Sequence, residues 1–402
     1  MKFFFKPQLK SIVKWLLMLA VFPIAILIWV IRPLYKIQFI MIPSTAIGHY
    51  AGNVDTFLVD QAVNPRKKTQ YIFYYHLNTK PINMQLHLMW SRVIPIVTAQ
   101  WVTKIIVALE LLSDKIGFFG KIFYNIRGNN FDAGDRDKTG KMANSHSFLK
   151  FTPDEVIKGE EGLLTMGIPK DAKFIVLHSR DRAFLAGQYF RNTEIESFFK
   201  AAKYFFEKGY YVVRTGACVS NPIPSSEHYI IDYASQFRTE FMDLYLSARC
   251  DFYFGDSCGF YALSTCFRKP LAITNQSPLL NGPYFYQKAV LLPKKYWLKT
   301  EKRYMPLSEI IATDSGHLYG EENYAARGIE VHSNNTDEIL SFAIEMNARL
   351  NDHYLETEEE KNIQTAFKEK VSAVDIVLKP NGTVRCKLSS SFVKANSYFL
   401  QD

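Results

Sequence analysis

The stretch DFYFGDSCGFYALSTCFRKPLAITN, residues 251–275, predicts a strand, a tight turn, a helix and a second strand in immediate succession. Residues 251–254 are a short aromatic run suited to a buried strand, and residues 255–259 are a compact turn of small residues. Residues 260–267 carry apolar side chains at helical spacing, and residues 271–274 return to an extended pattern after a proline. This succession is typical of one unit of an α/β sheet.

The turn at residues 255–259 is the main sequence signal for a ligand. Small residues at a strand-to-helix turn let the backbone approach a bound group closely, and the free N–H groups of a first helical turn favour an anion. A phosphate is the obvious candidate. The alternative is an ordinary strand-to-helix turn in which the Ser257 hydroxyl caps the helix. The residues of the turn leave both interpretations open.

Three more strands are predicted upstream of this stretch, in alternation with helices. The strands fall at residues 173–178, 210–214 and 228–232, and the helices at residues 195–207 and 237–247. Short strands that alternate with helices of this length predict a parallel α/β sheet.

Polar side chains gather at the C-terminal ends of these predicted strands, where the ligands of parallel sheets bind. They are His178, Arg180, Asp181, Arg214 and Ser257. Either arginine could neutralise a phosphate bidentately, because a guanidinium matches two phosphate oxygens. The alternatives are that Asp181 pairs with Arg180 and that His178 is a structural histidine.

The N-terminal part of the chain predicts a smaller set of elements. Strands are predicted at residues 37–42, 71–75 and 93–97, helices at 54–63 and 101–112, and loops at 44–55 and 117–146. A loop as long as residues 117–146 is usually functional or mobile, so it either closes over an acceptor or lacks fixed structure.

The C-terminal part predicts a last strand at residues 324–332 and a helix at residues 336–350. Residues 356–370 predict a charged helix with a solvated face. Residues 374–402 are apolar enough to pack back on the rest of the protein.

Composition indicates a globular protein of two or three domains. The chain has 402 residues, 48% of them hydrophobic and 15% aromatic, which argues against disorder. Its five cysteines form no Cys-x-x-Cys pair and no zinc-ligand spacing, which is typical of reduced thiols in a cytosolic compartment.

The net charge of +9 is concentrated near the N-terminus, where residues 1–68 hold nine Lys and Arg against two Asp. No aromatic–basic repeat or nucleic-acid motif accompanies these charges, so we expect no nucleic-acid partner. Residues 15–31 form an uncharged apolar run of 17 residues, at the short end of what spans a bilayer. Trp15 and Trp29 stand where interfacial anchors belong, and Pro23 predicts a kink.

The basic flanks on both sides of residues 15–31 predict association with an anionic membrane surface. Two topologies compete: a single span, and a kinked helix that dips into the bilayer and returns. We favour the second, because it keeps both basic flanks in the cytosol. A cleaved signal peptide is disfavoured, since Arg32-Pro33 follows the run directly in place of a small-residue cleavage site. The expected location is the cytoplasmic face of a membrane, with residues 15–31 as the anchor.

Taken together, several segments make the chain resemble a family of bacterial glycosyltransferases associated with surface-carbohydrate clusters. The segments are Ile47-Gly48-His49 with Asn53, VLHSRD (176–181), RNTEIESF (191–198), GYYVVRTG (209–216), GDSCGFYALSTCFRKPLAITN (255–275), GIEVHSNNTDEILSFAIEMNARL (328–350) and LSSSFVKANSYFL (388–400). The chain departs from the family in residues 42–46, which lack the expected basic residue before Ile47.

The resemblance implies the GT-B fold, an α/β architecture of two Rossmann-type domains that face a cleft. The implied organisation is a membrane-associated helix at residues 1–36, an acceptor domain at 37–150, a donor domain at 151–372 and a tail at 373–402 that packs on the body. The implied activity moves a sugar from a nucleotide-activated donor to a surface-glycan acceptor, which could be lipid-linked. No cofactor and no metal are implied.

On this fold, His49 faces the cleft as the candidate general base, with Asp55 as a lesser candidate. The alternatives are that His49 stabilises its loop and that Asp55 is a charge at the start of a helix. The donor diphosphate would lie against the turn of Asp256, Ser257, Cys258 and Gly259, with Arg180 and Arg214 neutralising its charge. The other cleft candidates are His178, Asp181, Asn53 and Arg191.

Two further functions remain open from the sequence. A nucleotide-sugar 2-epimerase uses the same scaffold, but it would gain nothing from the apolar run and would need carboxylates in the cleft. A non-catalytic glycan- or lipid-binding module would tolerate replacement of the turn at residues 255–259.

Overall fold

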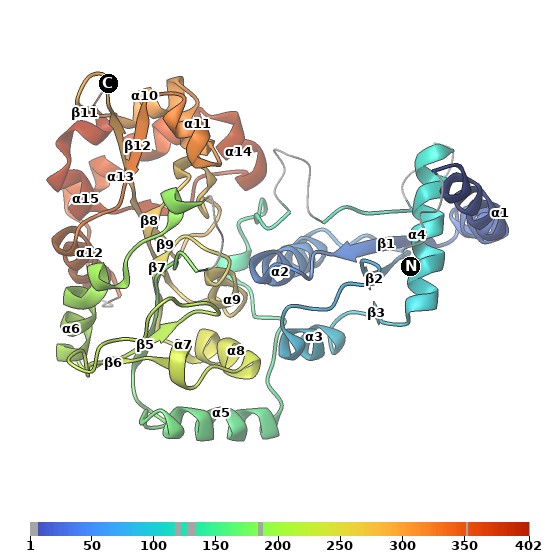
Figure 1. Cartoon of the computed structure of the whole chain (residues 1–402), viewed down its shortest axis with the longest axis horizontal. Helices are drawn as coiled ribbons and strands as arrows, with labels where there is room; N and C mark the ends of the chain where they lie inside the picture. Colours follow the sequence, from blue (N-terminus) through green and yellow to red (C-terminus); the bar gives the residue numbers. More distant parts are fainter. Residues whose placement is uncertain (1–6, 117–121, 127–133, 184–187, 351–352, 402) are drawn as a thin grey trace.

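The computed structural model describes residues 7–116, 122–126, 134–183, 188–350 and 353–401. The chain forms two lobes, each built on a parallel sheet with helices against it (Figure 1). The mixed α/β class predicted from the sequence is therefore confirmed.

The N-terminal lobe has a three-stranded parallel sheet in the order β1-β2-β3. Its elements are β1 (Lys36–Ile42), α2 (Ile47–Val63), β2 (Thr69–Tyr75), α3 (Met84–Ser91), β3 (Ile96–Val97) and α4 (Gln100–Lys115). Alternate residues of β1 face opposite sides of the sheet. Ile40 and Ile42 join the main core, whereas Phe39 joins a second core under α4.

The C-terminal lobe is built on a seven-stranded parallel sheet in the order β13-β9-β8-β7-β4-β5-β6. The strands are β4 (Phe174–His178), β5 (Tyr211–Thr215), β6 (Ile230–Ile231), β7 (Tyr253–Asp256), β8 (Leu271–Gln276), β9 (Ala289–Pro293) and β13 (Lys387–Leu388). The helices between them are α5 (Pro153–Thr165), α6 (Phe199–Glu207), α7 (Tyr233–Gln236), α8 (Glu240–Arg249) and α9 (Tyr261–Cys266). β4 and β7 to β9 are buried along almost their whole length, as expected for a sheet covered on both faces.

The strand order defines where this sheet binds ligands. Counted within the lobe, β4 to β9 lie in the order 3-2-1-4-5-6, which is the order of doubly wound nucleotide-binding sheets. The order reverses between β4 and β7, which are hydrogen-bonded neighbours. In such sheets a crevice opens beyond the C-terminal ends of the two strands at the reversal. Those ends are His178 and Asp256.

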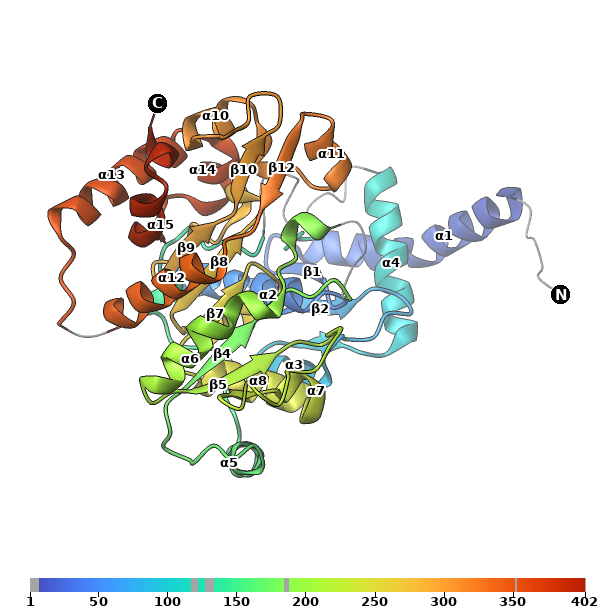
Figure 2. The ribbon, with the colours of Figure 1, turned by 60° about the vertical axis from the view of Figure 1, so that its left-hand side comes forward.

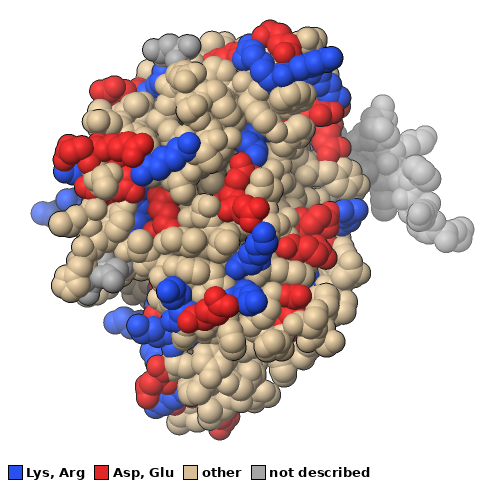
Figure 3. All heavy atoms as spheres, turned by 90° about the vertical axis from the view of Figure 1, so that its left-hand side faces the viewer, with Lys and Arg blue, Asp and Glu red and all other residues tan. Residues whose placement is uncertain are grey.

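The remaining C-terminal elements close the lobe. β10 (Lys295–Leu298) pairs antiparallel with β11 (Arg303–Tyr304) and β12 (Ile329–His332). The helices are α10 (Leu307–Ala312), α11 (Glu321–Ala325), α12 (Thr336–Arg349), α13 (Glu358–Ser372), α14 (Asp375–Asn381) and α15 (Ser390–Ala395). Figure 3 shows the face of the molecule that lies at the left of Figure 1, where Lys and Arg are interspersed with Asp and Glu.

The last part of the chain is fastened to this lobe by buried polar side chains. Gln364 of α13 accepts a hydrogen bond from the Leu388 N–H at 2.9 Å and donates one to the Leu388 carbonyl at 2.9 Å. Glu345 of α12 accepts from the Ser389 hydroxyl and from the backbone N–H groups of Ser390 and Ser391. These bonds hold β13 at the edge of the sheet.

The apolar N-terminal run is a helix, α1 (Pro7–Ile31), which crosses α4 at the end of the N-terminal lobe away from the C-terminal lobe (Figures 1 and 2). Met18, Val21, Ala25 and Ile28 form one buried stripe at helical spacing and pack on the core under α4. By length and composition, residues Lys14–Ile31 could cross a membrane, which is weak evidence for membrane association.

Two sequence expectations about elements are wrong. Residues 47–53, expected in a loop, are the first two turns of α2, because tertiary packing against α9 outweighs the low helix propensity of Gly48, Gly52 and Asn53. The strand expected at residues 324–332 begins only at Ile329, after α11. The charged helix expected at residues 356–370 is α13, which has the expected solvated face and buries Phe367 and Val371 on the other.

Candidate functional site

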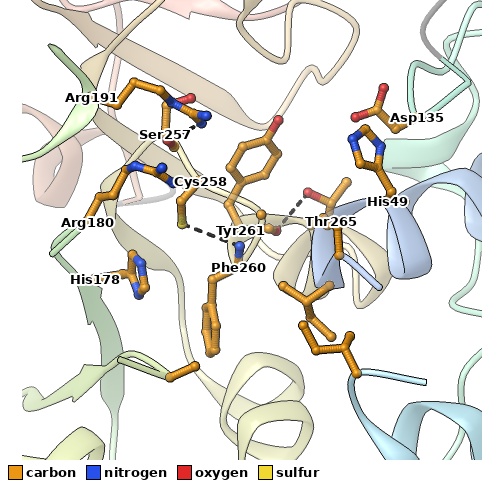
Figure 4. A pocket seen from close by; sticks show the side chains of 18 of the residues that line it. His49, Asp135, His178, Arg180, Arg191, Ser257, Cys258, Phe260, Tyr261 and Thr265 are labelled. Atoms are coloured by element: carbon orange, nitrogen blue, oxygen red, sulfur yellow. Dashed lines mark hydrogen bonds between the residues drawn. The ribbon is translucent and has the colours of Figure 1, made fainter. Parts of the chain in front are cut away.

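A cavity of about 560 Å³ lies between the two lobes, beyond the C-terminal ends of β1, β4 and β7. His49 lines it from the N-terminal lobe and Ser257 lines it from the C-terminal lobe. Figure 4 shows His49 at one side of the cavity and Arg180, Arg191 and the turn after β7 at the other. The cavity is therefore the crevice that the strand order predicts.

The lobes touch at two glycines beside this cavity. A Cβ placed on Gly48 would lie 2.7 Å from the Gly259 Cα, and one on Gly259 would lie 3.0 Å from the Gly48 nitrogen. Real Cβ atoms are essentially never closer than 3.0 Å to such atoms, so Gly48 must lack a side chain for the first turn of α2 to reach the β7–α9 turn.

His49 is held in one orientation by Asn53, one turn later on α2. The Asn53 side-chain nitrogen donates to the Ile126 carbonyl at 2.6 Å, which leaves its side-chain oxygen as the acceptor for His49 Nδ1 at 3.1 Å. Nδ1 therefore carries the proton in the neutral ring, and Nε2 has the free lone pair. His49 itself is exposed and lines the cavity, so Nε2 is available as a base.

Asp135 brings a carboxylate to the same edge of the cavity (Figure 4). A Cβ on Gly52, one turn beyond His49 on α2, would lie 3.3 Å from the Asp135 Cβ. Its neighbour Arg136 is buried and donates to the carbonyls of Gly282 at 2.6 Å and Asn281 at 2.8 Å. The segment that carries Asp135 is thus fixed to the C-terminal lobe.

The β7–α9 turn is closed by the sulfur of Cys258. This atom accepts from the Phe260 N–H at 3.3 Å and lies 3.5 Å from the Tyr253 hydroxyl. Arg191 donates to the Ser257 carbonyl at 3.0 Å, so a cationic side chain lies directly over the turn. The turn is thus held on one side by a thiol and on the other by a guanidinium.

Cys258 and His178 form a coupled pair in the cavity wall. Burial raises the pKa of the Cys258 thiol, but His178, with smaller contributions from the Tyr253 hydroxyl and the Phe260 N–H, outweighs burial and lowers that pKa to about 7. Burial lowers the pKa of His178, and the neighbouring Cys258 and Asp256 reverse this, so that it is raised overall. The His178 ring also stacks on Phe260, with ring centroids 5.3 Å apart.

Two arginines place positive charge beside the turn. Arg180 follows β4 and donates to the Gln188 side-chain oxygen at 2.9 Å, and Arg191 donates to the same oxygen at 3.3 Å. Burial and the neighbouring charge of Arg191 lower the pKa of Arg180 to about 10. Two like charges held together at a cavity wall favour an anionic ligand, because its charge would relieve their repulsion.

Asp256 organises this wall from behind. The carboxylate is fully buried and accepts from the Arg180 N–H at 2.9 Å, the Thr274 hydroxyl at 2.9 Å and the Asn275 amide at 3.2 Å. It therefore ties the ends of β4, β7 and β8 together. Asp256 does not line the cavity, so its predicted direct contact with a donor finds no support in the geometry.

Asp55 and Arg214, two other predicted site residues, lie in buried ion pairs. Asp55 pairs with Arg268 at 2.5 Å and 3.0 Å, which joins α2 to the segment after α9. Asp55 lines the cavity, but this bidentate pair occupies both oxygens of its carboxylate. Burial raises the pKa of Asp55, and the Arg268 charge offsets this only in part. Arg214 donates to Asp232 at 3.2 Å and to the Asn221 carbonyl at 2.8 Å, and it does not line the cavity. The sequence could not reveal these partners, which come from other elements.

Nine of the predicted site residues line the cavity: His49, Asp55, His178, Arg180, Asp181, Arg191, Ser257, Cys258 and Gly259. Asn53, Arg214 and Asp256 do not. Asp181 accepts from the backbone N–H groups of Ala183 at 2.8 Å and Ser220 at 2.9 Å, which shapes the cavity rim. Sequence reasoning missed Asp135, Tyr261 and Tyr319, and the only signal for Asp135 was the long polar loop at residues 117–146, part of which lies outside the described residues.

Within the described residues, no group of three or more His, Cys, Asp and Glu side chains could hold a metal ion. The expected absence of a metal and of a cofactor stays a prediction.

No protein-family model and no curated protein matches the chain. Among solved structures, it is similar to a glycosyl transferase family 9 protein from Veillonella parvula DSM 2008, with 11% identity, 78% of this chain and 97% of that chain covered, and a TM-score of 0.42. It is also similar to E. coli ADP-heptose lps heptosyltransferase II, with 11% identity, 64% and 90% covered, and a TM-score of 0.37. A third similarity is to the wall teichoic acid polymerase TagF, with 13% identity, 71% and 70% covered, and a TM-score of 0.26. Similarities this distant do not establish the activity of this chain.

Proposed function

We propose that the protein is a glycosyltransferase that moves a sugar from a nucleotide-activated donor to a surface-glycan acceptor, without a bound metal. The observation that carries the proposal is the content of the interlobe cavity. The oriented imidazole of His49 lines this cavity on one side, and two arginines and a turn of small residues line it on the other. The turn lies where the strand order reverses, which is where doubly wound sheets bind nucleotides.

The donor half of the reaction needs groups that stabilise the departing nucleoside diphosphate. Arg180 and Arg191 flank the β7–α9 turn and place two cations where the diphosphate would lie. The two arginines would neutralise the diphosphate charge, as a divalent cation does in other phosphate sites. The His178–Phe260 stack forms an aromatic wall beside them.

The acceptor half needs a base opposite the leaving group. His49 Nε2 takes the proton of an acceptor hydroxyl as its oxygen forms a bond to the anomeric carbon of the donor sugar. The bond from that carbon to the diphosphate oxygen breaks, and its electron pair leaves with the nucleotide. Asp135, at the same edge, supports the positive charge that His49 gains.

The acceptor side of the proposal is linked to a membrane. Outside its packed stripe, α1 exposes large apolar side chains. Leu16, Leu19 and Leu27 are 61%, 66% and 60% exposed to solvent. A helix with this surface lies in or on a lipid bilayer. The proposed place of action is the cytoplasmic face of the inner membrane, with a glycan or lipid-linked acceptor.

The nucleotide-sugar 2-epimerase alternative gains one observation, because Asp135 places a carboxylate in the cavity that could take a proton from the sugar ring. Product identity separates the two functions. A transferase releases a nucleoside diphosphate and a glycosylated acceptor, whereas an epimerase returns an altered nucleotide sugar and needs no acceptor.

The first test is a thermal-shift screen of the full chain against UDP, GDP and ADP. A ligand that binds only the folded state raises Tm, so one nucleotide should give a clear shift. Arg191→Gln should abolish that shift, because Arg191 lies over the turn. Arg182→Gln is the matched control, since Arg182 pairs with Glu194 at the surface and does not line the cavity. An equal loss of the shift in both variants, or no shift with any nucleotide, would contradict the donor site.

A further inference from the structure

A second cavity, of about 450 Å³, lies at the opposite end of the N-terminal lobe, between the end of α1 and the beginnings of β1 and β2. Four cationic side chains line it: Arg32, Lys36, Arg66 and Lys67. The other lining residues are Ile28, Ile37, Gln38, Thr69 and Ile122, so none of the described residues in its wall is acidic. This is a basic cavity with an apolar side.

The cations converge because separate segments of the chain meet here. Arg32 follows α1, Lys36 begins β1, and Arg66 and Lys67 precede β2. The Lys36 N–H donates to the Lys68 carbonyl at 2.8 Å, which fixes the starts of the two strands side by side. The cluster is therefore set by the register of the sheet.

Three of these positive charges have no acidic partner within the described part of the protein. Among the ion pairs of the described residues, none involves Lys36, Arg66 or Lys67, and all three side chains are exposed. Arg66 lies 5.2 Å from the ring centre of Tyr124, which fixes its position without cancelling its charge. Cations gathered in this way favour a multiply bonded anion such as a phosphate.

The apolar surface of α1 begins at the mouth of this cavity. Ile28 lines the cavity, while Leu27 and Val30, on the same turns of α1, are 60% and 56% exposed. Leu34, in the link from α1 to β1, is 76% exposed, and Trp101 at the start of α4 is 69% exposed. A ligand with a phosphate and long hydrocarbon chains could bind the basic cavity through the phosphate and the apolar face of α1 through the chains.

We propose that this second cavity binds the phosphate of an anionic phospholipid, whose acyl chains run along the exposed face of α1. Charge complementarity selects the headgroup, and the apolar face of α1 selects a lipid over a soluble phosphate. α1 then lies along the membrane surface, because its buried stripe keeps it packed against α4.

This lipid site is distinct from the proposed sugar-transfer site. The second cavity lies at the N-terminal end of β1 and the interlobe cavity lies beyond its C-terminal end, with all seven residues of β1 between them. At about 3.3 Å per residue the two sites are roughly 20 Å apart. The inference therefore does not depend on the proposed activity.

Vesicle flotation of the full chain tests the proposal, with vesicles of phosphatidylcholine alone or mixed with phosphatidylglycerol. The wild type should prefer the anionic vesicles. Lys36→Gln combined with Lys67→Gln should weaken binding to anionic vesicles roughly tenfold or more, because each basic residue at an anionic surface contributes about 1 kcal/mol. Binding to neutral vesicles should stay unchanged, since it depends on α1.

The matched control is Lys203→Gln combined with Lys208→Gln, which removes the same net charge from α6 and its end. α6 lies in the other lobe, at the side whose face carries both charge signs in Figure 3. This control should retain the preference for anionic vesicles. Equal weakening by both pairs would show only general attraction and would overturn the site. The lipid assignment would also fail if inorganic phosphate, at constant ionic strength, raised Tm and abolished flotation of the wild type on anionic vesicles.

Discussion

At the scale of single residues, the interlobe cavity contains a buried thiol, Cys258, whose neighbours lower the pKa that burial alone would raise. Burial alone raises the pKa of a cysteine, as it does for Cys250 and Cys386, where the pKa is raised to about 12. Cys258 is just as deeply placed, yet His178 lowers its pKa to about 7. The neighbours of Cys258 cause the difference, His178 first and then the Tyr253 hydroxyl and the Phe260 N–H, and they make Cys258 the more reactive thiol.

Cys258 should therefore be alkylated faster by iodoacetamide near neutral pH than Cys250 or Cys386, as followed by peptide mass spectrometry. With a pKa of about 7, roughly half of Cys258 is thiolate at pH 7, against a few per cent for an ordinary thiol. Its rate should rise through pH 7 and level off above about pH 8, because the thiolate is then fully formed. His178→Phe should move that rise to higher pH. A rate that kept climbing beyond pH 9 in the wild type would contradict the pair.

His49 is the residue on which the proposed chemistry depends most. His49→Gln should lower kcat by roughly 10²–10⁴-fold, the usual contribution of a general base. The nucleotide-induced Tm shift should be preserved, because His49 belongs to the lobe opposite the arginines. An unchanged kcat in this variant would show that His49 is not the general base, and Asp135 would be the next candidate.

At the scale of secondary-structure elements, side-chain caps and side-chain pairing determine where segments begin and end. Thr152 and Glu155 form the capping box that starts α5. Asn335 and Glu338 do the same for α12. Such signals are local, so they can be recognised without knowledge of the fold.

Gln364 shows the opposite case, where a side chain of α13 pairs with the backbone of β13. Gln364→Leu should lower the free energy of unfolding by about 2 kcal/mol or more, because the buried N–H and carbonyl of Leu388 would both lose their partner. Urea denaturation measures this loss. Thr365→Ala, on the exposed side of the same helix, is the control and should cost much less, because the Thr365 hydroxyl bonds only to the Lys361 carbonyl one turn earlier. Equal losses in the two variants would contradict the role of Gln364.

At the scale of the whole molecule, the two lobes are joined by contacts that no local pattern reveals. The strands β1 to β8, the α/β class and most of the cluster at the strand ends could be predicted, because alternation and polarity are local properties of the sequence. The strands β9, β10, β11 and β13 were not predicted. The partner of Asp55 is 213 residues away, and Asp135 lies in a segment without periodicity. Their places depend on how the lobes pack, which is why Asp55 was predicted as catalytic and Asp135 was missed.

The Asp55–Arg268 pair provides the test of this interface. Asp55→Ala should destabilise the protein by about 3–5 kcal/mol, because it leaves the Arg268 charge buried and unpaired. Asp55→Leu combined with Arg268→Met should recover most of that loss in a denaturant titration. If Asp55→Ala instead abolished turnover with no change in stability, Asp55 would be a catalytic base after all.

The direction of β1 has a consequence for the acceptor. The strand begins beside the basic cavity and α1, and it ends at the interlobe cavity. If α1 rests on the bilayer, the reacting hydroxyl must project about the length of this strand, roughly 20 Å, above the headgroups. A sugar attached directly to a lipid headgroup would be out of reach, whereas the free tip of an oligosaccharide several units long could enter. The protein would then extend glycans that other enzymes have begun.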